Sequence, residues 1–144
     1  MSFFCKEQDI LPLHEFQDIT DVISVAVKES EVSSGLCVVY SKHTTACIRI
    51  LENELLLMHD MHAFLERIAP SCGVYKHDDI EHRTVPPDER INGFAHIRAM
   101  FLNHQECIPI VDGDLDLGKW QRVFYIDCDF GKPDRKLNTF IIGA

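Results

Sequence analysis

The sequence lacks the motifs that define several large classes of enzyme. It contains no Gly-rich phosphate-binding loop, no dinucleotide-binding glycine pattern and no Gly-x-Ser-x-Gly nucleophile motif. These absences argue against a kinase-like nucleotide-binding enzyme, a hydride-transferring dehydrogenase and a serine hydrolase. The sequence also has no apolar run of the ~20 residues that a membrane-spanning helix needs. We therefore expect no membrane partner.

Basic residues are scarce as well. The chain has 14 Lys and Arg against 23 Asp and Glu, which gives a net charge of −9 with His neutral. Such a surface repels the phosphate backbone of nucleic acids, so we expect no nucleic-acid partner. The six cysteines form no C-x-x-C pair, and the N-terminus lacks the basic start and apolar stretch of a signal peptide. These features predict a cytoplasmic protein with reduced cysteines.

The length of 144 residues suits one domain, residues 1–144, with a single sizeable core. Short runs of apolar and β-branched residues predict strands. The predicted strands are residues 36–40, 46–51, 107–111, 115–117, 121–127 and 137–142. Asp112-Gly113 is a strong hairpin signal between two of them.

Apolar residues at helical spacing predict helices between these strands. The first begins at Thr20 as its N-cap and ends at Ser33-Ser34-Gly35. The second covers residues 53–68, and the third follows Asn92 as its cap. Their predicted buried stripes are Leu57, Met61, Phe64, Leu65 and Ile68, and then Phe94, Ile97 and Phe101. Residues 71–90 are predicted to form a long loop, which in a compact domain is often functional. The predicted fold is therefore α+β, with a mostly antiparallel sheet and two or three helices.

Two histidines are candidates for metal binding or proton transfer. His77 lies in the long loop and His96 in the third helix, and their spacing matches no local zinc motif. Folding would therefore have to bring them together. A neutral imidazole binds divalent metals such as zinc, and its charge changes near neutral pH. Each histidine could equally be an ordinary hydrogen-bonded or surface side chain.

Acidic residues near these histidines could support the same chemistry. Asp78 adjoins His77, and Glu52 and Asp60 could share a broad face of the second helix. Either acid could complete a metal shell or hold the imidazoles in one tautomer. Glu54, by contrast, is expected only to favour the start of that helix. Asn92 and the following Gly leave backbone N–H groups available for an anion.

Two further segments are candidates for binding a substrate. The loop His43-Thr44-Thr45 could receive phosphate oxygens, or its hydroxyls could satisfy backbone groups. The corner Gly118-Lys119-Trp120-Gln121 contains the only Trp of the chain, which could plug the core, line a pocket or form a subunit contact. Lys119 and Arg135 are the local cations that an anionic substrate would use.

Taken in order, these motifs resemble those of the YjbQ-like family, small proteins often labelled secondary thiamine-phosphate synthases. The resemblance covers the chain from about Leu36 to Gly143. It is carried by His43-Thr44-Thr45-Ala46, Glu52 with Asp60, Tyr75-Lys76-His77-Asp78, residues 92–96 and residues 113–121. Lys119 replaces the usual Thr before Trp120, and residues 84–89 are extra sequence relative to the family pattern.

The resemblance implies an α+β fold assembled as a homotrimer, with polar clefts that include the histidines. It also implies a small phosphorylated substrate, a divalent metal such as Mg²⁺ or Zn²⁺ at His77 and His96, and weak joining of a hydroxymethylpyrimidine diphosphate to a thiazole phosphate. In that reaction His77 and His96 would bind metal or move protons, and Asp78, Glu52 and Asp60 would orient them.

Two other functions fit the same residues. One is a non-catalytic trimeric module that binds a metal or an anion, and the other is a metal-dependent hydrolase.

Overall fold

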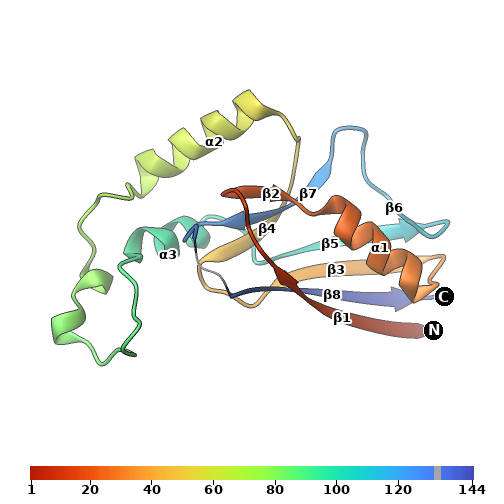
Figure 1. The fold of residues 1–144 in the computed structure, drawn as a ribbon. Helices are drawn as coiled ribbons and strands as arrows, with labels where there is room; N and C mark the ends of the chain where they lie inside the picture. The colour runs from red at the N-terminus through yellow and green to blue at the C-terminus, as the bar shows by residue number, and fades with distance from the viewer. Residues whose placement is uncertain (132–133) are drawn as a thin grey trace.

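Two antiparallel sheets pack face to face in the computed structural model, which describes residues 1–131 and 134–144 (Figure 1). The five-stranded sheet has the order β1-β8-β3-β5-β6, and the three-stranded sheet has the order β2-β7-β4. The strands are β1 (Ser2–Ile10), β2 (Phe16–Asp18), β3 (Gly35–Ser41), β4 (Ala46–Leu51), β5 (Gln105–Val111), β6 (Asp114–Leu115), β7 (Arg122–Asp127) and β8 (Arg135–Gly143). The helices are α1 (Thr20–Ser30), α2 (Leu55–Ile68) and α3 (Gly93–Met100), with two short 3-10 helices, η1 (Lys76–Asp78) and η2 (Ile80–His82). The predicted α+β class with a mostly antiparallel sheet is confirmed.

Strand β7 lies between two separate apolar clusters, which explains why its sequence is apolar without alternation. Val123 and Tyr125 belong to the main core, together with α1 and the inward faces of β3 and β8. Phe124 and Ile126 belong to a second cluster on the opposite face of the same sheet, with residues of α3. A strand covered on both faces has no solvent side to mark with polar residues.

The predicted strands after residue 35 are confirmed to within two residues at each end, and both residues of the Asp112-Gly113 turn have positive φ. Strand β1 was not predicted, because its sequence lacks a regular alternation of apolar and polar residues. Two of its inward-facing positions are the polar residues Lys6 and Gln8. It is held by antiparallel pairing with β8 along its whole length, from Ser2 opposite Gly143 to Ile10 opposite Arg135.

The predicted helix caps were partly wrong. Thr20 lies inside α1, and the Asp18 carboxylate accepts hydrogen bonds from its backbone N (2.9 Å) and its hydroxyl (2.7 Å). The side chain of Asn92 does not cap α3. Glu54 does cap α2, because its carboxylate accepts from Leu56 N (2.8 Å) and Leu57 N (2.7 Å). The expected stabilisation of that helix start is therefore present.

The predicted buried stripes of α2 and α3 were only partly right, since Leu65 is buried and Phe94 packs partly buried against the second apolar cluster. On α2 only Leu65 is buried, and Phe64 is exposed. The buried residues of α3 are Gly93, two alanines and Arg98, whereas Ile97 and Phe101 are exposed. Apolar side chains at helical spacing need a neighbouring element to bury them, and much of α2 stands clear of the sheets (Figure 1). Among the described residues no helix is long and apolar enough to cross a membrane.

Candidate functional site

His77 and His96 lie against each other. His77 is on η1 and His96 is on α3, and their ring centroids are 4.5 Å apart with the ring planes tilted by 59°. Both side chains are partly exposed, so a ligand can reach them. The predicted convergence of these two imidazoles is therefore present within a single chain.

Two contacts between η1 and the start of α3 hold the histidines in this position. The Asp78 carboxylate accepts a hydrogen bond from the backbone N of Gly93 at 2.8 Å. Tyr75 packs directly over Gly93, where an added Cβ would lie 2.5 Å from the Cβ of Tyr75. Only Gly allows so close an approach. Asp78 therefore occupies the helix N-terminus that the sequence offered to an anion, and it stabilises the site rather than facing a substrate.

Glu89 and Arg83 border the imidazole pair on the side of the long loop. Glu89 Oε1 lies 3.8 Å from His77 Nε2 and 3.1 Å from Arg83 Nη2. Arg83 also donates a hydrogen bond to the carbonyl of His77. Burial lowers the pKa of His96, and the neighbouring His77 lowers it further. The negative charges of Asp129 and Glu89 act in the opposite direction, but the net shift of the pKa is downward. His96 therefore favours the neutral form, which can accept a proton.

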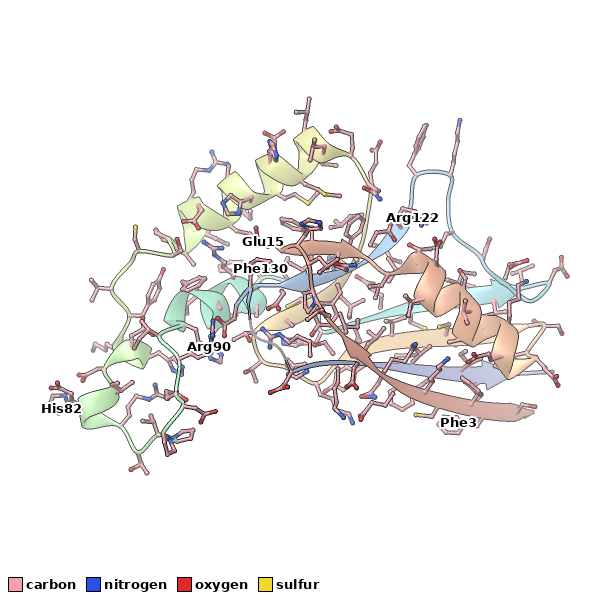
Figure 2. The ribbon with its side chains drawn as sticks, in the orientation of Figure 1. Phe3, Glu15, His82, Arg90, Arg122 and Phe130 are labelled. Carbon is pink, nitrogen blue, oxygen red and sulfur yellow. The ribbon has the colours of Figure 1, made fainter. Side chains whose placement is uncertain are left out.

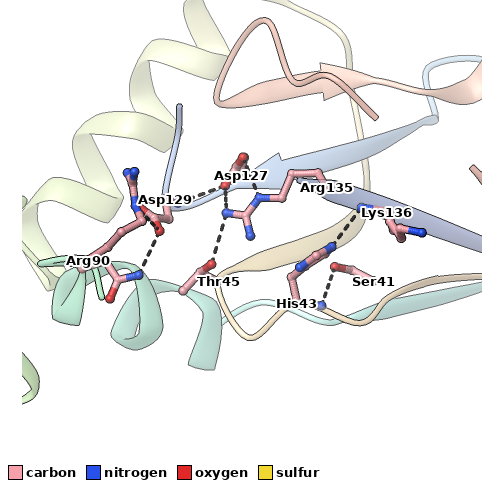
Figure 3. Close-up of polar contacts among 9 residues, drawn as sticks. Ser41, His43, Thr45, Arg90, Asp127, Asp129, Arg135 and Lys136 are labelled. Atoms are coloured by element: carbon pink, nitrogen blue, oxygen red, sulfur yellow. Dashed lines mark hydrogen bonds and ion pairs between the residues drawn. The ribbon is translucent and has the colours of Figure 1, made fainter. Parts of the chain in front are cut away.

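Asp129 and Arg90 border the pair on the side of the sheet. Asp129 accepts hydrogen bonds from Arg90 Nη2 at 2.9 Å and from Asn92 Nδ2 at 2.8 Å (Figure 3). Burial disfavours the charge of Asp129, but these hydrogen bonds outweigh it, so its pKa is lowered and it stays ionised. Asn92 therefore holds this carboxylate instead of capping the helix.

Arg135 belongs to a buried ion pair beside this site. Its side chain is 1% exposed, and its Nε donates to Asp127 Oδ2 at 3.0 Å. Its Nη2 donates to the hydroxyl of Thr45 at 3.1 Å (Figure 3). The predicted role of Arg135 as a substrate cation does not fit this placement, because its charge is already paired and lies inside the protein.

The His43-Thr44-Thr45 loop is engaged mainly with strand β8. His43 Nε2 accepts a hydrogen bond from the backbone N of Lys136 at 2.9 Å, so that nitrogen carries no proton (Figure 3). Thr45 is buried and bound to Arg135, whereas Thr44 is exposed. Of the three residues, Thr44 presents its side chain most openly to a ligand.

The Gly118–Gln121 corner lies at the other end of the molecule from η1, in the connection between β6 and β7 (Figure 1). The Gln121 side-chain oxygen accepts from Gly118 N at 2.8 Å, which closes the turn. Lys119 lies over the Trp120 ring, 4.7 Å from its centroid. Trp120 is 64% exposed, so it does not plug the core. Within one chain this corner cannot meet the histidines.

Glu52 lies between β4 and α2, and Asp60 lies in the middle of α2. Both are exposed, and among the described residues neither shows a contact with His77 or His96. The carboxylates whose charges act on the imidazole pair in this chain are Glu89 and Asp129. The sequence carried one signal for Glu89, its place in a long polar loop, and none for Asp129.

A metal would need more ligands than the two imidazoles. In the described part of the chain no three His, Cys, Asp or Glu side chains are arranged to hold a metal ion. Structural zinc sites take four protein ligands and catalytic ones take three, and Mg²⁺ prefers oxygen ligands. His77 and His96 therefore form at most part of a metal site within one chain.

Comparisons with known proteins agree with this fold. A sequence model of the family described as "UPF0047 protein YjbQ-like" matches residues 11–144. A UPF0047 protein from Methanothermobacter thermautotrophicus is 32% identical over 129 residues, which cover 90% of this chain and 83% of that protein. A UPF0047 protein from Synechocystis is 36% identical over 130 residues, which cover 84% of this chain and 81% of the relative.

Solved structures show the same arrangement. A crystal structure described as a YbjQ-like protein of unknown function from Sulfolobus solfataricus superposes with a TM-score of 0.85 at 26% identity, covering 99% of this chain and 98% of the other. A YjbQ/UPF0047 protein from Clostridium acetobutylicum gives a TM-score of 0.78 at 32% identity, covering 95% and 99%. The chain therefore belongs to the UPF0047 YjbQ-like family.

Proposed function

We propose that this protein binds a small phosphorylated molecule at the His77–His96 pair and has weak thiamine-phosphate synthase-like activity there. The observation that carries the proposal is the ring contact between two imidazoles from distant segments, one of them biased toward its neutral form. A neutral imidazole beside a second one can take up and return a proton near neutral pH.

The proposed reaction transfers a pyrimidine-methyl group. A C–N bond forms to the ring nitrogen of the thiazole phosphate, and the C–O bond to the diphosphate breaks, so the electron pair leaves with the diphosphate. A ring N–H of His77 would donate a hydrogen bond to that leaving group, and His96, in contact with the His77 ring, would hold that ring in position. The substrate diphosphate would enter as its magnesium complex, and no step depends on a metal held by the protein.

The test supplies purified protein with both thiamine precursors and Mg²⁺, and measures thiamine phosphate by chromatography. We expect slow product formation that His96→Ala abolishes. His82→Ala is the matched control, because His82 lies on the neighbouring η2, is exposed and, among the residues that the structure describes, hydrogen-bonds only to Asp79. Absence of product at high protein concentration would refute the transferase activity.

The second candidate is a non-catalytic module that binds a metal or an anion. It is favoured by the state of the two nearby cations, because Arg83 is paired with Glu89 and Arg90 with Asp129. Neither guanidinium is free to stabilise a leaving group. Elemental analysis of the purified protein and calorimetry with inorganic phosphate distinguish the two functions, since tight binding without turnover supports the module.

We also propose that the chain assembles as a homotrimer through the outer face of the five-stranded sheet. No helix of the described chain covers that face (Figure 1), and it carries exposed apolar side chains such as Phe3, Leu36 and Ile142. Contiguous apolar patches of this kind are typical of subunit interfaces. Assembly could also bring the Trp120 corner of one chain toward the histidines of another.

The oligomeric state tests this arrangement directly. We expect a trimer by sedimentation equilibrium, and we expect Leu36→Glu to shift it to monomers. Val25→Glu is the control, because Val25 on α1 is similarly exposed, 53% against 44%, but does not lie on this sheet. A wild-type monomer, or an equal effect of both substitutions, would contradict the proposed interface.

A further inference from the structure

A hollow of about 500 Å³ lies between α2 and the edge of the three-stranded sheet, apart from the histidine pair. One wall is formed by residues 14–18, which include strand β2, and the other by the first two turns of α2. None of its lining residues belongs to the His77–His96 site. Its volume is in the range of small-molecule sites, which span about 300 to 1,000 Å³.

The inner surface of the hollow is apolar and partly aromatic. It is lined by Phe16 on β2, Phe124 on β7, and Leu55 and Met58 on α2. Leu55 is 66% exposed although it faces this surface, so α2 leaves apolar area open to water at the mouth. A flat aromatic body would bury that area, pack against the partly exposed Phe16 ring and contact the Met58 sulfur favourably.

One imidazole at the rim has a fixed orientation. His62 Nδ1 lies 2.6 Å from Glu15 Oε2, and an ionised carboxylate only accepts hydrogen bonds. When the ring is neutral, Nδ1 therefore carries its proton, and Nε2 is an acceptor with no bonding partner in the described part of the chain. Glu15, which lies on the side of β2 that faces α2 (Figure 2), is held in turn by Arg98 Nη1 at 3.4 Å.

The two carboxylates of the rim do not call for a cationic ligand. Glu15 is paired with Arg98 and His62. Asp18 accepts hydrogen bonds from Arg122 Nε at 2.8 Å and from Asn53 Nδ2 at 2.9 Å. Both carboxylates therefore already accept hydrogen bonds from protein donors, and His62 Nε2 is an acceptor beside them for which the described residues show no partner.

We infer that this hollow binds a small aromatic molecule whose hydroxyl donates a hydrogen bond to His62 Nε2. The apolar walls hold the ring, and the Glu15–His62 pair recognises the hydroxyl. A phenol is the simplest ligand of this class.

The test titrates the protein with p-cresol and, separately, with 4-methylanisole, which has the same ring but no hydroxyl donor. Binding is followed by the NMR signals of the histidine rings. We expect saturable shifts of His62 with p-cresol and affinity roughly fivefold weaker for the anisole, the loss of one hydrogen bond. His62→Phe should remove that preference. Equal affinity for both probes in the wild type would refute recognition by His62.

A matched pair of substitutions tests the location. Leu55 and Leu56 are adjacent and almost equally exposed, 66% and 68%, but only Leu55 lines the hollow. Asp is well tolerated at both positions, because they lie in the first turn of α2. Leu55→Asp should weaken p-cresol binding roughly tenfold through lost apolar contact, and Leu56→Asp should leave it unchanged.

Besides equal affinity for the two probes, three outcomes overturn the inference. The first is the absence of saturable binding in the wild type, and the second is an equal effect of Leu55→Asp and Leu56→Asp. The third is that p-cresol fails to bind while Leu55→Asp alone changes the sedimentation coefficient. That result would identify the hollow as an interface between copies of the chain instead of a ligand site.

Discussion

Replacing Arg135 by Met is expected to cost about 3–5 kcal/mol of unfolding free energy, the usual consequence of leaving one partner of a buried ion pair alone. Arg135 is 1% exposed and its partner Asp127 is fully buried. Without the guanidinium, the Asp127 carboxylate stays in the core with no opposite charge, and the Thr45 hydroxyl loses a donor.

The structure places the cost toward the lower end of that range. Asp127 keeps one hydrogen bond in the variant, from the backbone N of Asp129 at 3.1 Å. A loss of about 3 kcal/mol is still a large share of the ~5–15 kcal/mol typical of a domain, and corresponds to a fall in melting temperature of roughly 10 °C.

Urea unfolding followed by circular dichroism measures this loss. The control is Arg49→Met, because the Arg49–Glu106 pair at 3.3 Å is partly exposed and should contribute less than about 1 kcal/mol. The double variant Arg135→Met with Asp127→Leu should recover much of the stability, since it removes the buried charge as well as its partner.

The reasoning fails if the unfolding free energy of Arg135→Met lies within about 1 kcal/mol of the wild-type value. It also fails if the double variant is no more stable than Arg135→Met alone. Either result would mean that the Arg135 charge is not committed to Asp127. It would then be available to a phosphorylated ligand, as the sequence suggested.

Three other substitutions or measurements test the site and its neighbour α2. Gly93→Ala should cost about 1–3 kcal/mol by overpacking against Tyr75, and should separate the rings of His77 and His96; unchanged urea unfolding and ring shifts would contradict the packing. His96 should titrate by NMR with a midpoint below 6.5, because burial lowers its pKa. The unfolded chain then binds more protons near that midpoint, so stability should rise with pH up to about 6.5 and this slope should be smaller in His96→Gln. Glu54→Ala should lower the melting temperature by removing the α2 cap. The backbone N–H bonds lower the pKa of Glu54, so the advantage of the wild type should be present above pH 4.5 and disappear as pH falls further below it. A wild-type advantage that persists in strong acid would rule out a role for the charge.

Elements with local signals were predictable from the sequence, whereas those that depend on distant pairing were not. Strand β4 is specified by its own run of apolar residues. The Asp112-Gly113 turn is specified by the positive φ that both of its residues must adopt. Strand β1 exists because β8, at the other end of the chain, offers it a partner. The stripe on α2 followed the helical period correctly, but periodicity does not say whether another element lies against it.

In the candidate site, too, residues with a local sequence signal were predictable and those brought in by distant parts of the chain were not. His77 and His96 could be proposed together because imidazoles near carboxylates suit a few kinds of chemistry. Of the assigned carboxylates, Glu52 and Asp60 do not reach the pair within one chain, whereas Glu89 and Asp129 come near it through the folded loop and the end of β7. Asp78 was correctly expected beside the site, but its role depends on Gly93, whose backbone N–H it binds.

The charges around the histidines determine how a phosphorylated ligand could enter. Both neighbouring guanidiniums are paired, Arg83 with Glu89 and Arg90 with Asp129, so a phosphate must displace a carboxylate or bring its own counter-ion. Asp129 is buried and held from two sides, whereas the Glu89 side chain is partly exposed. Glu89 is therefore the carboxylate that gives way. Glu89→Gln should strengthen the binding of inorganic phosphate measured by calorimetry, because it frees Arg83 and removes a negative charge beside His77. A weaker affinity in Glu89→Gln would mean that the anion enters elsewhere.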